Sequence, residues 1–319
     1  MYRGFAFKKT CELSRGERDN LRALFSDVFG KSLTEEHFDR KYLRTPLGYS
    51  YHGLMTAEDA IVGAYNVIPY EYDYFGRRVL FGLSVDTMIG GDCRGGPFSL
   101  REMATLVYDA MRRDNLGFVF GFPNEMAYEY TKRLLRWNDI GELDFYVLPR
   151  RISAIVPKLA GIDWLGRLVV AGSLRLPWRG RPAKAHVHIE KICNGAFEEH
   201  RYDGDYSSLA VSDGGECTYR LCTEERGIRV LYIVDVHPLR ADALREAVRG
   251  LYRRHARSID MMLYVGDPSF DSGPLIRVPK SRRPCRVRMC GRILTPGMVD
   301  ERVFQMENWS VNLSNFDVR

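Results

Sequence analysis

The feature of this sequence that most constrains its fold is a glycine-rich segment, GGDCRGGPFSLREM (90–103), between a strand-like run and a helix-like run. The run before it, VLFGLSVDTMIG (79–90), reads as a long strand. After it, Pro97 stands where a helix favours proline, and an apolar helical face follows, made of Leu100, Met103, Ala104, Val107 and Met111. Glycines before a helix N-terminus leave backbone N–H groups open to a phosphate. The segment predicts either an α/β layer with an anionic ligand at the helix mouth or a plain flexible turn.

The surrounding pattern alternates strands and helices. Residues 5–9 read as a strand, and Ser14-Arg-Gly-Glu17 is a capping-box signature for a helix that ends at Gly30. Thr34 is expected to cap a short helix that carries Phe38 and Tyr42. Further strands are expected at 61–69, 71–81 (turning near Gly76), 117–122 and 141–148, with a helix from Asn124 to about Arg136.

The second half of the chain resembles the first. SLREMATLVYDAMRR (99–113) aligns with ALREAVRGLYRRHAR (243–257) at an offset that also places 117–122 over 261–266. Upstream, VDTM (85–88) resembles VDVH (234–237), with a shorter connection to the helix in the second copy. Either two amphipathic helices match by chance, or the second half is a degenerate copy without the glycine-rich loop. We predict domains at 1–150 and 185–319, joined by a proline-containing segment at 151–184.

Composition excludes several classes of protein. With 319 residues, 45% of them hydrophobic and 28% charged, the chain is typical of a globular protein rather than a disordered one. No stretch has the apolar length of a membrane span, and the first residues lack the apolar region of a secretion signal. Seven scattered cysteines suit free thiols in a reducing cytoplasm, where we expect the protein to reside. A net charge of +6 suits a small anionic ligand better than nucleic acid.

The run from the strands through DTMIGGDCRGGPFSLREM to GFPN (121–124), Tyr128 and Trp137 resembles the GNAT superfamily of acyl-CoA N-acyltransferases. Arg94-Gly95 matches the Arg-Gly of the family's loop, and Ile89 matches the strand valine before it. The resemblance covers roughly residues 3–150. The rest fits more loosely with tandem members that acylate dTDP-linked amino-deoxysugars for surface polysaccharides. It implies two GNAT-like domains, each a mixed sheet flanked by helices, the second degenerate.

The resemblance also implies a set of ligand contacts. An acyl-CoA, acetyl-CoA or another short one, would be the co-substrate. An amine, with a dTDP-amino sugar as the preferred acceptor, would attack its thioester directly. The strand amide near Met88 or Ile89 would point at the thioester oxygen. Asn124 would either orient the pantetheine or cap its helix. The diphosphate would be held at the loop by Arg94, Gly95, Gly96, Phe98 and Ser99.

Catalysis without metal or covalent intermediate would rest on positioning and proton transfer. Asp86, three residues before Ile89, is the candidate general base; alternatively it only hydrogen-bonds neighbouring backbone. Tyr128 is favoured over Tyr130 as the acid that protonates the departing thiolate, unless both are core aromatics. The sequence departs from the family where Pro97 replaces the loop's central glycine and Thr131 the usual tyrosine.

Other readings remain open. Cys93, before the N-terminus of a helix, suggests an enzyme with an acyl-cysteine intermediate. No histidine lies at a sequence spacing that would mark it as the base for this cysteine. His186 and His188 alternate without a third ligand, so we predict no metal site. The basic run 280–292 is either a solvated strand face or a surface for a diphosphate or acidic partner. A different amine acceptor, a non-catalytic acyl-CoA sensor or scaffold, and a nucleic-acid-associated protein are the rival functions. A homodimer is compatible with the sequence, and no membrane partner is expected.

Overall fold

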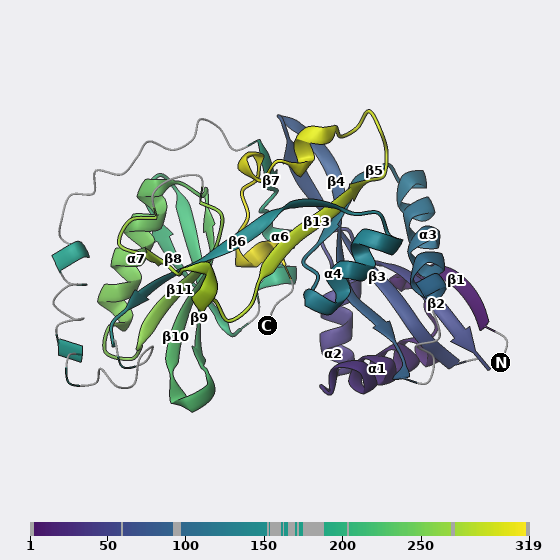
Figure 1. The fold of residues 1–319 in the computed structure, drawn as a ribbon, viewed down its shortest axis with the longest axis horizontal. Helices are drawn as coiled ribbons and strands as arrows, with labels where there is room; N and C mark the ends of the chain where they lie inside the picture. The colour runs from purple at the N-terminus through teal and green to yellow at the C-terminus, as the bar shows by residue number, and fades with distance from the viewer. Residues whose placement is uncertain are drawn as a thin grey trace. The chain divides into compact units, whose positions relative to one another are not determined.

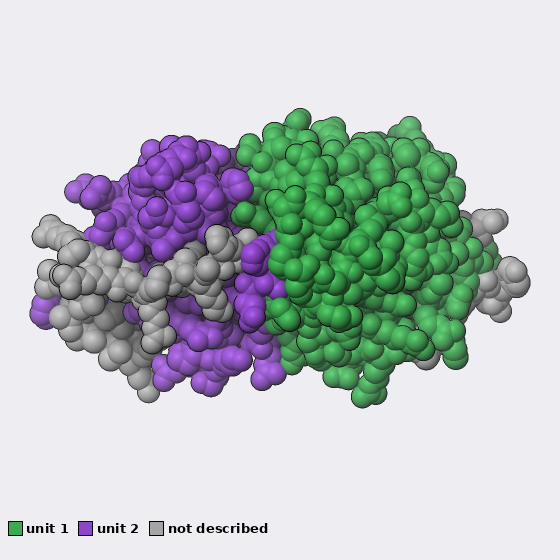
Figure 2. All heavy atoms as spheres, turned by 90° about the horizontal axis from the view of Figure 1, so that it is seen from above, with its two compact units in different colours: residues 1–141, 189–201, 287–306 green, residues 142–188, 202–286, 307–319 purple. Residues whose placement is uncertain are grey.

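The computed structural model describes residues 3–58, 60–91, 97–151, 153, 161, 163–164, 170, 172–174, 188–202, 204–268 and 272–316. The chain divides into two compact units (Figure 2). Unit 1 comprises residues 1–141, 189–201 and 287–306; unit 2 comprises 142–188, 202–286 and 307–319. The C-terminal half thus returns twice to unit 1, unlike our predicted division into consecutive segments. None of the helices in the described part of the chain is long and apolar enough to cross a membrane.

Unit 1 is built on a mixed sheet (Figure 1). Its strands run in the order β1 (Arg3–Lys9), β2 (Tyr51–Ala57), β3 (Ala60–Tyr74), β4 (Arg77–Ile89), β5 (Leu116–Gly121) and β13 (Val287–Ile293), with β7 (Ile189–Lys191) also paired to β3. Only the β4–β5 pair among these is parallel. The separate strands expected at 61–69 and 71–81 are wrong, because β3 runs unbroken to the turn at Phe75-Gly76. β2 was not predicted.

The first helices form as their end signals predict. In α1 (Arg15–Phe29), the Ser14 hydroxyl accepts from the Glu17 N–H, the Glu17 carboxylate accepts from the Ser14 N–H, and Gly30 ends the helix at φ 65°. Thr34 caps α2 (Glu35–Phe38), which continues as a π-helical turn, η2 (Asp39–Leu43). This turn carries Lys41 and Tyr42 toward β4.

The helices cover opposite faces of the unit 1 sheet. Side chains of successive strand residues point to opposite faces. Tyr51, Tyr65 and Val67 pack with the long helix α3 (Pro97–Arg113), whereas the adjacent His52 and Asn66 face α1 and α2. Figure 1 shows α1 and α2 together, apart from α3. Asp86 therefore contacts residues of the α1–α2 side.

Unit 2 has a second mixed sheet and its own core (Figure 1). The strands run β6 (Asn138–Pro149), β11 (Met261–Gly266), β10 (Arg229–His237), β9 (Gly215–Thr223) and β8 (Tyr206–Val211), with β12 (Ile276–Arg277) also paired to β6. Only β10–β11 is parallel among these pairs. The helix α7 (Ala241–His255) buries Leu244, Val248 and Leu251 against this sheet. The predicted fold class, mixed sheets flanked by helices, is confirmed.

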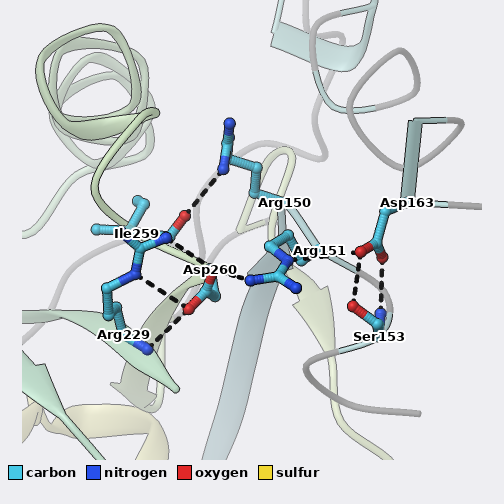
Figure 3. Close-up of polar contacts among 7 residues, drawn as sticks. All are labelled: Arg150, Arg151, Ser153, Asp163, Arg229, Ile259 and Asp260. Atoms are coloured by element: carbon cyan, nitrogen blue, oxygen red, sulfur yellow. Dashed lines mark hydrogen bonds and ion pairs between the residues drawn. The ribbon is translucent and has the colours of Figure 1, made fainter. Parts of the chain in front are cut away.

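One end of the unit 2 sheet is held by an arginine cluster around Asp260 (Figure 3). Asp260 accepts from Arg229 and Arg151, and Arg150 donates to the carbonyl of Ile259. Burial alone would raise the pKa of the Asp260 carboxyl, but these hydrogen bonds outweigh it and lower the pKa to about 2. The cluster ties the end of β6 to the starts of β10 and β11, so its role is structural.

The same strand–helix–strand arrangement occurs in both units. β4, α3 and β5 form a parallel crossover in unit 1, and β10, α7 and β11 form one in unit 2. Both helices start at the positions that the sequence offset predicts. The structure thus reproduces the element order of the sequence repeat.

Residues near the C-terminus lie where β10 and β11 end. Asn312 forms an antiparallel bridge with Gly266, and the Asp267 N–H donates to the Val311 carbonyl at 3.1 Å. The Asn312 side chain donates to Asp235 at 2.7 Å. Residues 311–312 therefore lie against the C-terminal ends of β10 and β11 in unit 2.

Candidate functional site

A β-bulge in β4 places the candidate base. The β3–β4 register pairs Ala64 with Met88 but Asn66 with Val85, so two residues, Asp86 and Thr87, oppose Tyr65. Asp86 has φ 41°, a left-handed conformation that favours glycine and that a bulge can require. A non-glycine residue held there is costly, and such residues concentrate at functional sites.

The Asp86 carboxylate is largely buried and faces two donors from η2. The Tyr42 hydroxyl donates a short hydrogen bond to its Oδ2, and the Lys41 Nζ lies 2.5 Å from the same oxygen. The Lys41 side chain is 10% exposed and that of Asp86 15%. Such a buried ion pair needs close partners, because both charges have lost much of their water. The structure thus holds a carboxylate against an amine and a phenol at the bulge.

A chain of buried polar groups fixes the bulge backbone. The Asn66 amide nitrogen donates to the Asp86 carbonyl at 2.9 Å, and Asn66 Oδ1 lies 2.8 Å from His52 Nδ1. The other ring nitrogen, Nε2, lies 2.8 Å from the Thr10 hydroxyl. Since Asn66 Oδ1 can only accept, Nδ1 carries the proton. The Thr10 hydroxyl lies 2.8 Å from both Nε2 and the Tyr42 carbonyl, to which it donates. Burial lowers the pKa of His52 to about 4, which keeps the ring neutral.

Sequence reasoning did not find His52, Asn66 or Lys41 as site residues. His52 and Asn66 are polar residues inside otherwise apolar strands, and that is the signal that could have marked them. Lys41 lies among other charged residues of a helical segment, so nothing in its sequence surroundings distinguishes it as a site residue.

β4 extends beyond its parallel partner. The β4–β5 ladder ends at the Leu83–Phe120 pair, while β4 continues to Ile89. Among the described residues, no strand pairs with β4 on that side after Leu83. The bulge at Asp86 lies in this stretch, so the base candidate stands where the two parallel strands have parted.

Alternation of the ladder distinguishes the amides of Met88 and Ile89. The Gly90 N–H donates to the Val62 carbonyl of β3 at 2.9 Å, which makes Val62–Gly90 a hydrogen-bonded pair. In an antiparallel ladder such pairs alternate with pairs whose amides point outward. Ala64–Met88 is therefore also hydrogen-bonded, and the Ile89 N–H points away from β3. We expected the N–H of Met88 or Ile89 to point at the thioester oxygen. Because the Met88 N–H is directed at β3, this expectation now applies to Ile89 alone.

The glycine-rich loop is only partly described. Arg94, Gly95 and Gly96 lie outside the described residues, as does Cys93. α3 begins at Pro97, as predicted. In its first turn Phe98 is 67% exposed and Ser99 is buried.

The second helix of the predicted site is capped by Asn124. Its side chain accepts from the Ala127 N–H at 2.8 Å and begins α4 (Glu125–Leu134). The structure shows the capping alternative directly. Thr131, which our sequence resemblance aligned with a tyrosine, donates its hydroxyl to the Tyr128 carbonyl.

Tyr128 belongs to a separate polar cluster. Its hydroxyl donates to Asp139 at 2.9 Å, and the Arg288 guanidinium lies 4.3 Å from its ring centre. The hydrogen bond to Asp139 raises the pKa of Tyr128 and keeps the phenol protonated. The structure places Tyr128 at the start of α4 and Asp86 at the bulge, with no hydrogen bond between them. Tyr130 is 53% exposed.

Two buried tyrosines form a pair that includes the residue opposite the bulge. The hydroxyls of Tyr65, which opposes the bulge, and Tyr108 of α3 are 3.0 Å apart. The Trp137 ring N–H donates to Tyr108 at 2.9 Å. Burial raises the pKa of Tyr108 to about 12 and that of Tyr65 well above its usual range. Both phenols are protonated at neutral pH.

The fold has known counterparts. Over 91% of this chain, the structure resembles a conserved protein from Enterococcus faecalis described as a probable N-acyltransferase (TM-score 0.57, 13% identity, 73% of that chain). It is similarly close to GCN5-related N-acetyltransferases from Anabaena variabilis (TM-score 0.58, 14% identity, 73% of that chain) and Kribbella flavida (TM-score 0.57, 14% identity, 71% of that chain).

This chain has the GNAT fold. The likeness at such low identity establishes the fold alone. In sequence, no family model and no curated protein matches the chain. Our sequence resemblance assigned β4 and the N-terminus of α3 to an acyl-CoA site, and this assignment remains a prediction.

The remaining candidates do not join this site. No disulfide joins the six described cysteines, Cys11, Cys193, Cys217, Cys222, Cys285 and Cys290. His186 lies outside the described residues, and the His188 N–H donates to the Asn308 carbonyl. In the basic run, Arg283 pairs with Glu142 and Asp144, and Arg292 donates to the Leu135 carbonyl. These arginines have structural partners in their own units.

Proposed function

We propose that the protein is an N-acyltransferase that moves an acyl group from acyl-CoA to an amine. The observation that carries the proposal is the placement of Asp86 in a strained bulge three residues beyond the last β4–β5 pair, followed by the outward-directed amide of Ile89. A carboxylate beside an edge amide suits direct attack of an amine on a thioester, because one group takes a proton and the other donates to a developing oxyanion.

Acyl-CoA supplies an activated acyl group as a thioester. The chain would hold it with the Ile89 edge of β4 along the pantetheine and with the α3 N-terminus toward the diphosphate. Arg94, Gly95 and Gly96 stay predicted diphosphate contacts, with Ser99 and Phe98 in the first turn of α3. This assignment is supported by the direction of the Ile89 N–H, away from β3, and by the start of α3 at Pro97.

Each catalytic role rests on a specific group. Asp86 accepts the proton that the acceptor amine loses, directly or through water. The His52–Asn66 chain fixes the bulge backbone and so positions the carboxylate. Tyr128 remains our predicted acid for the leaving thiolate. The protonated Tyr65–Tyr108 pair, in which Tyr65 opposes the bulge, is the alternative.

The acceptor is the least specified part of the proposal. A dTDP-linked amino sugar follows from the sequence resemblance alone, and the relatives in the fold comparison are described only by N-acyl or N-acetyl transfer. We therefore propose an amine acceptor, with the nucleotide sugar as the first to test.

The test is release of free thiol from acetyl-CoA in the presence of an amine panel that includes a dTDP-amino sugar, a polyamine and an aminoglycoside. We expect amine-dependent thiol release by the wild-type protein and its loss in Asp86→Asn. CoA binding without release for any amine would instead favour a sensor or scaffold.

A further inference from the structure

The Asp86 carboxylate is paired with an amine of the chain itself. Lys41 Nζ lies 2.5 Å from Asp86 Oδ2, with the Tyr42 hydroxyl on the same oxygen. The side chains of Lys41 and Asp86 are 10% and 15% exposed, so the pair is largely shielded from bulk solvent. An amine against a carboxylate base is the arrangement that acyl transfer to nitrogen requires of its acceptor.

The pair also lies near the edge that we assign to the acyl donor. Asp86 precedes Ile89 by three residues on β4, a separation of about 10 Å along a strand and less where a bulge shortens it. Lysine has a flexible four-carbon side chain, so its amine can shift without movement of the η2 backbone.

We propose that Lys41 is an internal acyl acceptor, modified in cis by acyl-CoA bound at the β4 edge. In this step a bond forms between Lys41 Nζ and the acyl carbonyl carbon while the thioester C–S bond breaks. The ammonium first gives one proton to Asp86, and the second proton lost by nitrogen ends on the released CoA thiolate. The products are N-acyl-lysine and free CoA. This inference rests on the proposed function, since it uses the same donor site and base.

Acylation would change the site. It removes the Lys41 charge and leaves the Asp86 carboxylate without its ammonium partner. An external amine then meets a site that carries one less positive charge. Lys41 acylation would thereby alter the reaction with other acceptors.

The experiment compares two acyl donors on the intact protein. Acetyl-CoA or acetic anhydride is added, and acetylation at each lysine is quantified by peptide mass spectrometry. Lys8 is the matched control, because it is also ion-paired, to Glu17 at 2.7 Å, but its side chain is 34% exposed. Acetic anhydride should label Lys8 more than Lys41, because labelling by a small reagent in solution increases with the exposure of the side chain. Acetyl-CoA should reverse the order, with Lys41 labelled on the order of ten-fold more than Lys8 because of proximity.

Two controls separate this inference from the proposed function. The rate of Lys41 labelling per molecule should not depend on protein concentration, as expected for a reaction in cis, and Lys41→Arg should remove the label. CoA binding is measured in parallel by calorimetry. CoA binding with Lys41 unlabelled, or labelled only in proportion to exposure with both donors, overturns the internal acceptor and leaves the proposed function standing. Absence of CoA binding overturns both.

Discussion

Asp86 and Asp235 stand at matching positions of the two strand–helix–strand repeats, each at a bulge before the long helix, yet their carboxylates face different surroundings. Asp86 meets Lys41 and Tyr42 and keeps partial exposure. Asp235 is 3% exposed and accepts from Tyr202 at 2.8 Å and Asn312 at 2.7 Å. Asp235 is closed in by two neutral hydrogen-bond donors, which suits a structural role, whereas Asp86 faces an amine and a phenol, which suits proton transfer.

This difference predicts opposite effects of the same substitution. Asp86→Asn should lower the acyl-transfer rate by roughly 10²–10⁴-fold, because a general base is lost, with CoA affinity nearly unchanged. Asp235→Asn should lower the free energy of unfolding by about 1–3 kcal/mol, because a buried acceptor of two hydrogen bonds is altered, and leave the rate near wild type. Steady-state kinetics and urea unfolding measure the two effects. Equal rate losses in both variants would return Asp86 to a structural role.

The hydrogen bonds of Asn312 predict a structural role for the C-terminal segment. Its side chain donates to Asp235 and accepts from the Ser314 N–H at 3.0 Å, and the residue is 1% exposed. Asn312→Ala should cost about 2–3 kcal/mol in thermal or urea unfolding. Asn312→Asp should cost more at neutral pH, because it sets a second carboxylate against Asp235, and recover as the pH falls. An Ala variant as stable as wild type would show that residues 311–312 contribute little to unit 2.

His52 predicts a dependence of stability on pH. Its pKa of about 4 in the folded protein lies below the 6.5 of an ordinary histidine. The unfolded chain therefore binds more protons between these values, and stability that is complete above pH 6.5 is lost as the pH falls toward 4. Between pH 7 and pH 5 the loss from this group is about 2 kcal/mol. Urea unfolding of wild type and His52→Gln at both pH values isolates it, and identical pH dependence in the two proteins would show that His52 is not the group responsible.

Two glycines of unit 1 predict opposite responses to alanine. A Cβ at Gly53 would lie 2.2 Å from the Met103 carbonyl oxygen of α3, a backbone atom that cannot turn aside. Gly53→Ala should destabilise on the order of 3 kcal/mol, because β2 and α3 must separate. A Cβ at Gly16 in α1 would meet open space, so Gly16→Ala should stabilise by about 0.5–1 kcal/mol. Thermal unfolding compares them, and a neutral Gly53→Ala would contradict the close approach of β2 and α3.

The sequence predicted what local signals encode. Ser14 and Gly30 mark the ends of α1, Pro97 the start of α3, and the offset repeat the positions of α7 and β11. It did not predict β2, nor the return of β7 and β13 to unit 1, because pairing between strands far apart in sequence leaves no local pattern. For the site, Asp86 followed from its spacing to Ile89, whereas Lys41 and His52 reach it through tertiary packing from other elements.

The most direct test of this account is a calorimetric titration of the whole chain with CoA and acetyl-CoA. We predict one site per chain, since the glycine-rich loop is present once and residues 311–312 lie against the corresponding strand ends in unit 2. We further predict that Gly95→Asp abolishes binding, because it places a negative side chain in the loop assigned to the diphosphate, and that Asp86→Asn retains binding. Absence of CoA binding by the wild-type protein would contradict the acyltransferase proposal, and two equivalent sites would contradict the degenerate second unit.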